Sequence, residues 1–248
     1  MSQRLRVAHL PTIDSTSVEV RRRWLAATDR EPLVLRADEQ VAGQGRHGRS
    51  WVSPRGGLWF SMAAPVHPPM SRFAAMPLAI GLAVVDALES VCGLDCRVKW
   101  PNDVLVADRK LAGILCQAEA GGERAFVIVG VGINGNFPES ALPGDLRHPA
   151  TTLLAQLGKP VDLDALLADL LPRLEAVIAA YDAGRQPPLT EILPPRLAWM
   201  GRAVRLSDAS LASDARGRLV GVDDTGGILI DQGGRSTAYR VGDLSLDA

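Results

Sequence analysis

A glycine-rich stretch with two arginines is the first segment of this sequence whose composition could support chemistry. Residues 43–51 read GQGRHGRSW, and Arg46 and Arg49 stand among three glycines. Glycine lets a backbone adopt positive φ and approach a ligand closely, and guanidinium groups form paired hydrogen bonds with carboxylate or phosphate. The stretch is therefore predicted to bind an anion. A surface turn with weakly paired arginines would have the same spacing, so that alternative stays open.

Polar residues gather in three further short stretches. Residues 99–103 read KWPND, residues 109–114 read RKLAGI and residues 129–135 read VGVGING. Lys99 and Lys110 flank a predicted hairpin that carries an Asn-Asp pair, although a plain turn also favours these two residue types. Taken one at a time, these stretches allow a ligand site or ordinary turns.

Taken together, the stretches resemble the biotin protein ligase family in order and spacing. The matching pieces are Asp14-Ser15-Thr16, Gln40 followed by residues 43–51, KWPND, RKLAGI and Gly132-Ile133-Asn134. The resemblance covers nearly the whole chain. It implies a two-step reaction in which biotin and ATP give biotinyl-5′-AMP and pyrophosphate. A lysine of a biotin carboxyl carrier protein, such as that of acetyl-CoA carboxylase, then takes the biotinyl group.

The resemblance also implies which residues form the site. Lys110 would bridge the biotin carbonyl and the α-phosphate, Arg46 would close over both, and Asp103 is a hypothetical base or orienting group for the acceptor lysine. The implied catalytic residues are Lys110, Arg46, Arg49 and Asp103. The implied biotin or adenylate contacts are Ser15, Thr16, Gln40, Gly43, Gln44, Arg46, Trp51, Lys110, Gly113 and Gly132. The implied nucleotide contacts are Arg46, Arg49, Asn102, Lys110 and Asn134. Mg²⁺ is expected with ATP, and its ligands are unknown.

Two departures from the family pattern keep other functions open. Gln44 stands where many members carry Arg, and Ser17 stands where Asn is common. Losing one cation could weaken retention of the adenylate. The rival functions are a lipoyl ligase or lipoyl/octanoyl transferase of related fold, and a binding module that senses biotin or an adenylate without transferring it.

Elements must position these residues, and the first two thirds of the chain predict a mixed or antiparallel sheet with packed helices. A capping box at Thr16–Glu19 predicts a helix through Trp24. An apolar stripe from Leu163 to Tyr181 predicts a long helix, with a kink at Pro172. A nearly all-apolar segment, residues 73–91, predicts a buried helix. Strands are expected at 5–10, 33–37, 57–64, 97–100, 103–106, 111–119 and 126–133, with hairpin links at 107–109 and 121–122.

The last fifty residues change in texture and predict a second, smaller domain. Four short strands separated by glycine-rich turns are expected at 203–206, 219–222, 227–230 and 237–241, which is typical of a small SH3-like β-barrel. A boundary near Pro194-Pro195 divides the chain into a catalytic domain, 1–195, and a barrel, 196–248. The predicted fold class is α+β.

Bulk properties restrict partners and location. The 248 residues carry a formal net charge of −1, from 27 basic and 28 acidic side chains, so neither DNA nor an anionic membrane is an expected partner. Only thirteen residues precede Asp14, too few for a helix-turn-helix, which favours a ligase without repressor activity. Three cysteines without a CxxC pair, no signal peptide and no apolar run near ~20 residues indicate a cytoplasmic protein. An exposed sheet edge could support a ligand-promoted homodimer.

Overall fold

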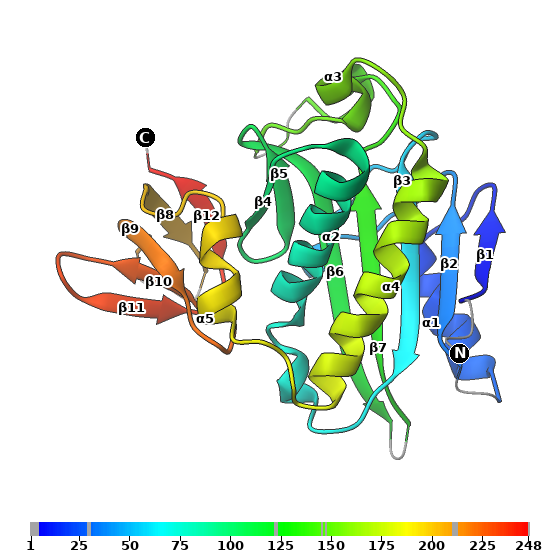
Figure 1. Ribbon diagram of the computed structural model, residues 1–248, viewed down its shortest axis with the longest axis horizontal. Coiled ribbons are helices and arrows are strands. Elements are labelled where there is room, and N and C mark those ends of the chain that lie inside the picture. Colours follow the sequence, from blue (N-terminus) through cyan, green and yellow to red (C-terminus); the bar gives the residue numbers. More distant parts are fainter. Residues whose placement is uncertain are drawn as a thin grey trace.

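A seven-stranded mixed sheet forms the centre of the molecule (Figure 1). The computed structural model describes residues 5–28, 31–121, 124–144, 146, 148–209 and 213–247. The strands are β1 (Val7–Leu10), β2 (Leu33–Ala37), β3 (Leu58–Pro65), β4 (Cys96–Lys99), β5 (Asp103–Val106), β6 (Arg109–Gly121) and β7 (Arg124–Ile133). Their order is β1-β2-β3-β7-β6-β5-β4, and only the β1–β2 pair of this sheet is parallel. The predicted mixed sheet is confirmed, while the predicted link at 121–122 extends outside the described residues.

Helices cover both faces of this sheet. The helices are α1 (Thr16–Ala26), α2 (Met76–Cys92), α3 (Leu153–Leu157), α4 (Leu163–Asp182) and α5 (Leu189–Ile192). Figure 1 shows α2 and α4 side by side on one face and α1 on the other. Side chains alternate between the faces of a strand, so β7 supplies both layers. Val127, Val129 and Val131 join the core under α2 and α4, whereas Phe126 and Ile128 join the core under α1.

Glycines replace apolar side chains where the cover of α1 ends. On the α1 face of β7, Phe126 and Ile128 are followed by Gly130 and Gly132, at the same alternation. On β6 the register partner of Gly132 is Gly113. Two neighbouring strands therefore lack side chains at the same level. This arrangement leaves space on this face of the sheet, next to the end of α1, that other side chains or a ligand can fill.

The start of α1 corrects the predicted capping box. Ser15 is the residue before the first helical turn, and its side chain makes no capping hydrogen bond. Glu19 does not reach back to Thr16 but pairs with Arg22 and Arg23 at 2.6 and 2.7 Å, and these two arginines lower the pKa of Glu19 to about 2. The hydroxyl of Thr16 is engaged elsewhere, toward β3. The helix itself was predicted correctly.

The helix α2 confirms the predicted buried helix but corrects the expectation that no apolar run approaches the ~20 residues that span a membrane. Together with the turn before it, residues Met70–Cys92 are long and apolar enough to cross a membrane by length and composition. Two thirds of that window is buried inside the protein. Its apolar surface packs against α4, β4 and β6, so its composition is explained by the core.

The three cysteines lie beside or within this core as free thiols. Burial raises the pKa of Cys96 and of Cys116 to about 12, and it also raises the pKa of Cys92. Thiolates are the reactive form, so all three behave as small apolar side chains at neutral pH.

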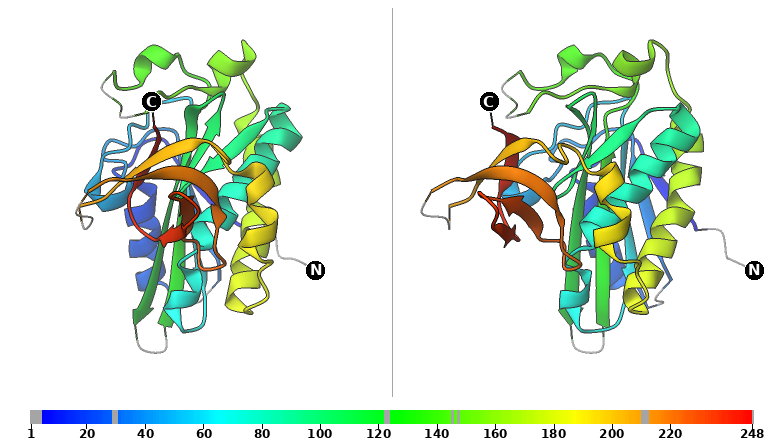
Figure 2. Two further views of the ribbon diagram at one scale, coloured as in Figure 1. Left: turned by 90° about the vertical axis from the view of Figure 1, so that its left-hand side faces the viewer. Right: turned by 60° about the vertical axis from the view of Figure 1, so that its left-hand side comes forward.

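The C-terminal part forms a separate small sheet beside β4 and β5 (Figures 1 and 2). Its strands are β8 (Ala203–Ser207), β9 (Ala215–Val222), β10 (Ile228–Asp231), β11 (Ser236–Tyr239) and β12 (Asp243–Leu246), all antiparallel in the order β11-β10-β9-β8-β12. The small β domain is confirmed, with one more strand than predicted. The division at residue 195 remains a prediction.

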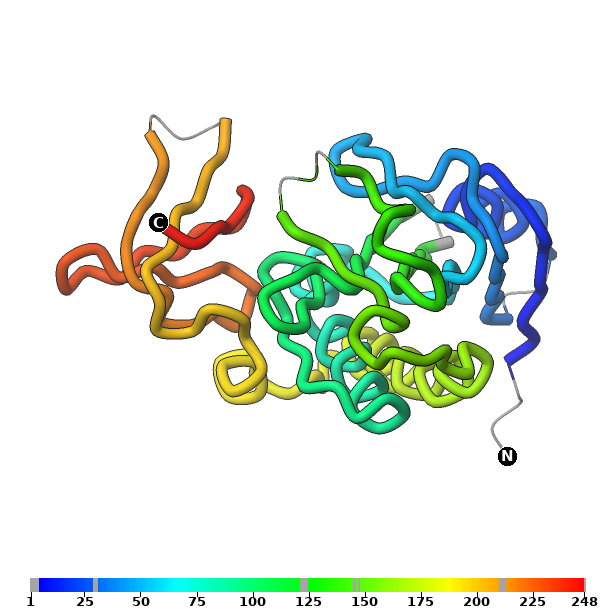
Figure 3. Tube along the Cα trace, turned by 90° about the horizontal axis from the view of Figure 1, so that it is seen from above, coloured from blue at the N-terminus to red at the C-terminus, as the bar shows by residue number. Residues whose placement is uncertain are grey.

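Two tryptophans connect the small domain to the large one. Trp100 donates its indole N–H to the carbonyl of Gly226 at 2.9 Å, and Trp199 donates to Asp108 at 2.8 Å. Both rings are buried, so each polar atom needs such a partner. Figure 3 shows from above that the small domain approaches the large one on the side of the segment around residues 95–110.

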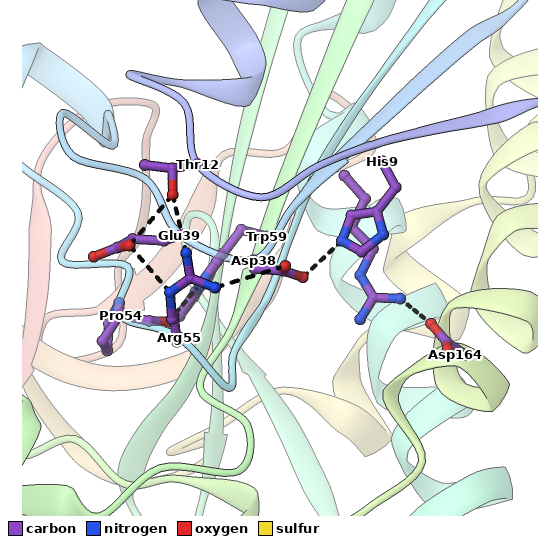
Figure 4. Close-up of polar contacts among 9 residues, drawn as sticks. His9, Thr12, Asp38, Glu39, Pro54, Arg55, Trp59 and Asp164 are labelled. Atoms are coloured by element: carbon purple, nitrogen blue, oxygen red, sulfur yellow. Dashed lines mark hydrogen bonds and ion pairs between the residues drawn. The ribbon is translucent and has the colours of Figure 1, made fainter.

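A surface network around Arg55 holds the segments just before Ser15 and Gln40, two of the predicted site residues (Figure 4). Arg55 lies 3.9 Å from Asp38 and 3.4 Å from Glu39, and it donates to Thr12 at 3.2 Å. Asp38 also accepts from His9 at 2.6 Å. These contacts join the ends of β1 and β2 to the residues before β3. Exposed ion pairs of this kind stabilise weakly, so their effect is to fix loop positions.

Candidate active site

One pocket of about 260 Å³ collects almost all the residues that the sequence singled out. It lies on the sheet face that α1 leaves uncovered. Its wall includes Ser15, Thr16, Gln40, Gln44, Arg46, Arg49, Trp51, Asn102, Asp103, Lys110, Gly113, Gly132 and Asn134. Five separate stretches of the sequence therefore meet at one place. Of the predicted residues, Gly43 alone does not line this pocket.

Gly43 has a structural reason to be glycine. A Cβ atom there would lie 2.4 Å from the carbonyl oxygen of Trp51. The two residues close the loop, because the Trp51 N–H donates to the Gly43 carbonyl at 2.8 Å. The predicted approach of Gly43 to a ligand remains a prediction. The residue lets the two ends of the glycine-rich loop touch.

The indole of Trp51 lies on the paired glycines of the sheet. A Cβ atom at Gly132 would be 2.5 Å from its Nε1, and one at Gly113 would be 2.9 Å from its Cζ3. The ammonium of Lys110 stands 4.9 Å from the centre of the ring, which is a favourable cation–π distance. Trp51 thus divides the pocket into a hydroxyl end, near α1, and a charged end, near β4 and β5.

The hydroxyl end is a connected set of hydrogen bonds. Gln40 Oε1 accepts from the N–H and the hydroxyl of Thr16 at 2.8 and 3.0 Å. The Thr16 hydroxyl lies 2.8 Å from that of Ser61, and Ser61 lies 2.9 Å from Ser17. Gln40 Nε2 donates to Ser53 at 2.8 Å. Such a buried network of neutral groups suits a neutral polar ring better than a charge.

The charged end is built around Asp103. Its Oδ1 lies 2.7 Å from the ammonium of Lys110, and its Oδ2 lies 3.7 Å from the ammonium of Lys99. Lys99 is only 3% exposed, and burial lowers its pKa. One carboxylate is shared by two lysines, so this end carries excess positive charge. That excess is what an incoming anion would meet.

Two arginines of the glycine-rich loop complete the charged end. Arg46 donates to Asn102 at 3.1 Å, and burial lowers the pKa of its guanidinium. Arg49 forms an ion pair with Asp243 of β12 at 2.6 Å, and this partner raises the pKa of Arg49. The small domain therefore contributes a residue to the pocket wall.

Asn134 lies in the pocket wall and is held there by hydrogen bonds within the protein. Its Nδ2 donates to the carbonyl of Thr151 at 2.9 Å, and its backbone carbonyl accepts from Leu153 at 2.9 Å. It fixes the segment that follows β7 against α3. Its predicted contact with a nucleotide remains a prediction.

Several residues of this wall were not predicted as site residues, among them Ser61, Lys99, His148 and Asp243. Ser61 is the only hydroxyl in the apolar strand β3, and Lys99 is a charge inside a buried strand, so both carried a readable signal. His148 and Asp243 lie in a loop and in a distant strand, and nothing in their local sequence indicates the pocket.

His148 sits at the charged end with a perturbed pKa. Burial lowers that pKa to about 4, and the neighbouring Lys99 and Lys110 act in the same direction. Its ring lies 6.3 Å from that of Trp199. At neutral pH the imidazole is therefore uncharged.

No metal centre is evident in the described ranges. Residues 5–28, 31–121, 124–144, 146, 148–209 and 213–247 hold no group of three or more His, Cys, Asp or Glu side chains placed to bind an ion. The two carboxylates of the pocket, Asp103 and Asp243, both face cations. These residues do not fit a resident Mg²⁺ site.

Comparison with known proteins points to one family. The profile described as "Biotin/lipoate A/B protein ligase family" matches residues 10–134. The biotin–[acetyl-CoA-carboxylase] ligase of Mycobacterium tuberculosis is 32% identical over 235 residues, covering 93% of this chain and 85% of that protein. The bifunctional ligase/repressor BirA of Bacillus subtilis is 30% identical over 207 residues and covers 81% of this chain. The match spans only 62% of the length of that relative.

Solved structures agree with this match. The biotin protein ligase of Aquifex aeolicus, in complex with biotin and ATP, superimposes with a TM-score of 0.79 and 30% identity. The superposition covers 97% of this chain and 98% of the Aquifex chain. Both the large sheet and the small β domain are therefore shared.

The neutral His148 predicts a specific pH dependence of stability. Its folded pKa lies below the unfolded value, so the unfolded chain binds more protons between about pH 6.5 and 4, and stability falls as the pH falls through this window. Between pH 7 and 4, the free energy of unfolding of the unsubstituted protein should fall. In His148→Gln it should fall by about 1–2 kcal/mol less, a figure that is discounted for the partial exposure of the ring. Urea unfolding of both proteins at the two pH values measures this. Equal losses would contradict it.

Proposed function

This chain belongs to the biotin/lipoate A/B protein ligase family, and from this premise we propose that it is an ATP-dependent biotin protein ligase. In the proposed reaction a biotin carboxylate oxygen attacks the α-phosphorus of ATP. The bond from that phosphorus to pyrophosphate breaks, giving biotinyl-5′-AMP. The neutral amine of an acceptor lysine then attacks the acyl carbon, and AMP leaves.

The observation that carries this proposal is a single pocket with two chemically different ends. The hydroxyl end offers Thr16, Gln40 and Ser61 to a neutral polar ring. The charged end offers Lys99, Lys110 and Arg46, which outnumber the nearby Asp103. A molecule with a polar ring at one end and a carboxylate at the other matches this order. Biotin has that constitution.

The cations serve the first step by offsetting repulsion. A carboxylate and a polyphosphate repel each other when they meet. Each cation about 4 Å from an anion offsets about 4 kcal/mol at an effective dielectric near 20. Lys110 is more accessible to a ligand than Lys99, because its side chain is 24% exposed while that of Lys99 is 4% exposed. We propose that Lys110 leaves Asp103 to meet the carboxylate and the α-phosphate.

The acceptor proposed for the second step is a biotin carboxyl carrier protein. The Mycobacterium tuberculosis relative is named for acetyl-CoA carboxylase, which supports a carrier of that kind. We propose no DNA binding by these residues, since a net charge of −1 offers no broad field for a polyphosphate. We also propose a cytoplasmic location, because the three cysteines are free thiols. Mg²⁺ would arrive on the ATP phosphates, as such ions usually do.

Adenylation should depend on Lys110. Biotin-dependent release of pyrophosphate from ATP should fall at least ~100-fold in Lys110→Ala, because the developing negative charge loses a positioned cation. Lys159→Ala removes an exposed lysine outside the pocket and is the matched control. Lipoate and octanoate should give no release. Release with lipoate instead of biotin would indicate a lipoyl ligase, and biotin binding without any release would indicate a sensor.

Asp103 has two candidate roles: it could position the two lysines, or it could act as a base for the acceptor lysine. Both of its oxygens face lysines, so the structure favours a positioning role over a free base. Asp103→Asn should slow pyrophosphate release about tenfold or more, because Lys110 and Lys99 lose their shared partner. Transfer from preformed biotinyl-5′-AMP to the carrier protein tests the base hypothesis separately. A transfer rate equal to that of the unsubstituted protein would remove Asp103 as a base.

One edge of strand β6 is open along part of its length. β5 pairs with β6 along Arg109–Gly113, and Asn102 binds the backbone of Ile114. Residues 115–120 of β6 are left with one edge that no other described strand covers. An open edge can pair with a second copy of the chain. We propose a homodimer through this edge, promoted by ligand. Sedimentation with biotin and ATP should show a dimer, and Ala118→Pro, which removes a backbone N–H on the open side of β6, should stay monomeric. A dimer unaffected by that proline would contradict the edge.

A further inference from the structure

The hydrogen bonds at the hydroxyl end have a direction that can be deduced. A backbone N–H can only donate, so the 2.8 Å contact from Thr16 requires the carbonyl oxygen of Gln40 to face it. The Gln40 amide nitrogen then faces Ser53, as its 2.8 Å contact requires. The hydroxyl of Thr16 lies 3.0 Å from the same carbonyl oxygen and therefore donates to it.

Each hydroxyl has one proton, and this fixes the rest of the chain. Because the Thr16 proton points to Gln40, Ser61 must donate in its 2.8 Å contact with Thr16. Because the Ser61 proton is then used, Ser17 must donate in its 2.9 Å contact with Ser61. This is the one assignment in which every contact is a hydrogen bond. All three protons point away from the Ser17 end and toward Gln40.

The assignment leaves acceptors rather than donors at the pocket end. Ser17 Oγ donates once and, within the described part of the chain, accepts no hydrogen bond, so its lone pairs are free. Ser17 and Ser61 are 7% and 0% exposed, and both line the pocket. An unpaired buried acceptor is costly, so a ligand that donates to it gains affinity. A ligand that presents a second acceptor there would be rejected.

Gly130 keeps this acceptor within reach of a ligand. A Cβ atom at Gly130 would lie 2.7 Å from Ser17 Oγ and 3.4 Å from Ser61 Oγ. Any side chain at this position of β7 would therefore cover both hydroxyls. The glycine leaves them at the pocket surface, on the sheet face beyond α1.

We propose that Ser17 and Ser61 determine specificity by presenting acceptors to ring N–H groups of the acid substrate. The inference deepens the proposed function and rests on it. The ureido ring of biotin carries two N–H donors, whereas the dithiolane of lipoate and the chain of octanoate carry none. Ser17 is thus a functional residue of this chain, at the position where the family pattern commonly has Asn.

Direct binding without ATP tests the proposal independently of catalysis. Isothermal calorimetry would compare biotin with its cyclic carbonate analogue, in which oxygen atoms replace both ring N–H groups without changing the ring shape. The unsubstituted protein should prefer biotin at least ~100-fold. Ser17→Ala should weaken biotin about tenfold and shrink this preference to about tenfold or less, because the free acceptor is gone.

Ser61→Ala gives a readout that a merely structural role would not move. Without Ser61 the Ser17 proton is released and can donate into the pocket, so the carbonate analogue should bind more tightly while biotin binds more weakly. Ser71→Ala, an exposed serine away from the pocket, should leave both affinities unchanged.

The outcomes separate the two claims. An unsubstituted protein that does not bind biotin would overturn the proposed function itself. Biotin binding with the same preference in the unsubstituted protein and in Ser17→Ala would overturn the specificity role of Ser17 and leave the proposed function standing. Ser17 lies in the first turn of α1, where alanine is a good helix former, so this variant is expected to fold.

Discussion

One buried carboxylate shared between two ammonium groups organises the charged half of the pocket. Asp103 faces Lys110 at 2.7 Å and Lys99 at 3.7 Å, and the three residues come from the neighbouring strands β4, β5 and β6. Removing the carboxylate would leave like charges close together in a poorly solvated site, which is strongly unfavourable. The three strands must therefore stay in register for the site to exist. Their antiparallel pairing places Lys99 opposite Asp103, and Asp103 opposite Gly113.

The second constraint is the absence of side chains on the same sheet face. Gly113 and Gly132 are register partners, and together they admit the indole of Trp51. Trp51 in turn carries the ammonium of Lys110 above its ring. The glycine-rich loop is thereby tied to the sheet through one aromatic ring, and Gly43 lets its ends close. A side chain at either sheet glycine would move the ring, and with it the cation.

Local sequence predicted most of the elements and most of the pocket wall, because those signals are short-range. Alternation and apolar runs located the strands and helices, and turn residues located the links. Residues that reach the pocket from distant parts of the sequence cannot be predicted in this way. Asp243 reaches the pocket because the small domain packs beside β4 and β5, and His148 reaches it because the loop after β7 folds over the charged end. Neither placement follows from spacing. The capping box at Thr16 was wrong for a related reason, since a hydroxyl that could cap a helix is used by Gln40 and Ser61 instead.

The pair between Arg49 and Asp243 shows how the charged half can accept a ligand without a large penalty. Their side chains are 54% and 25% exposed, so the pair lies partly in solvent despite its 2.6 Å distance. Pairs of this kind contribute about 1 kcal/mol or less. A polyphosphate that recruits Arg49 would therefore displace Asp243 at low cost. The Asp103 cluster differs, because Lys99 is almost fully buried and the ammonium groups of Lys99 and Lys110 lie 5.5 and 4.9 Å from the centres of aromatic rings. The pocket thus combines a less exposed cationic centre with a more exposed cation at the domain boundary that can change partner, which suits a site where phosphate arrives, reacts and leaves.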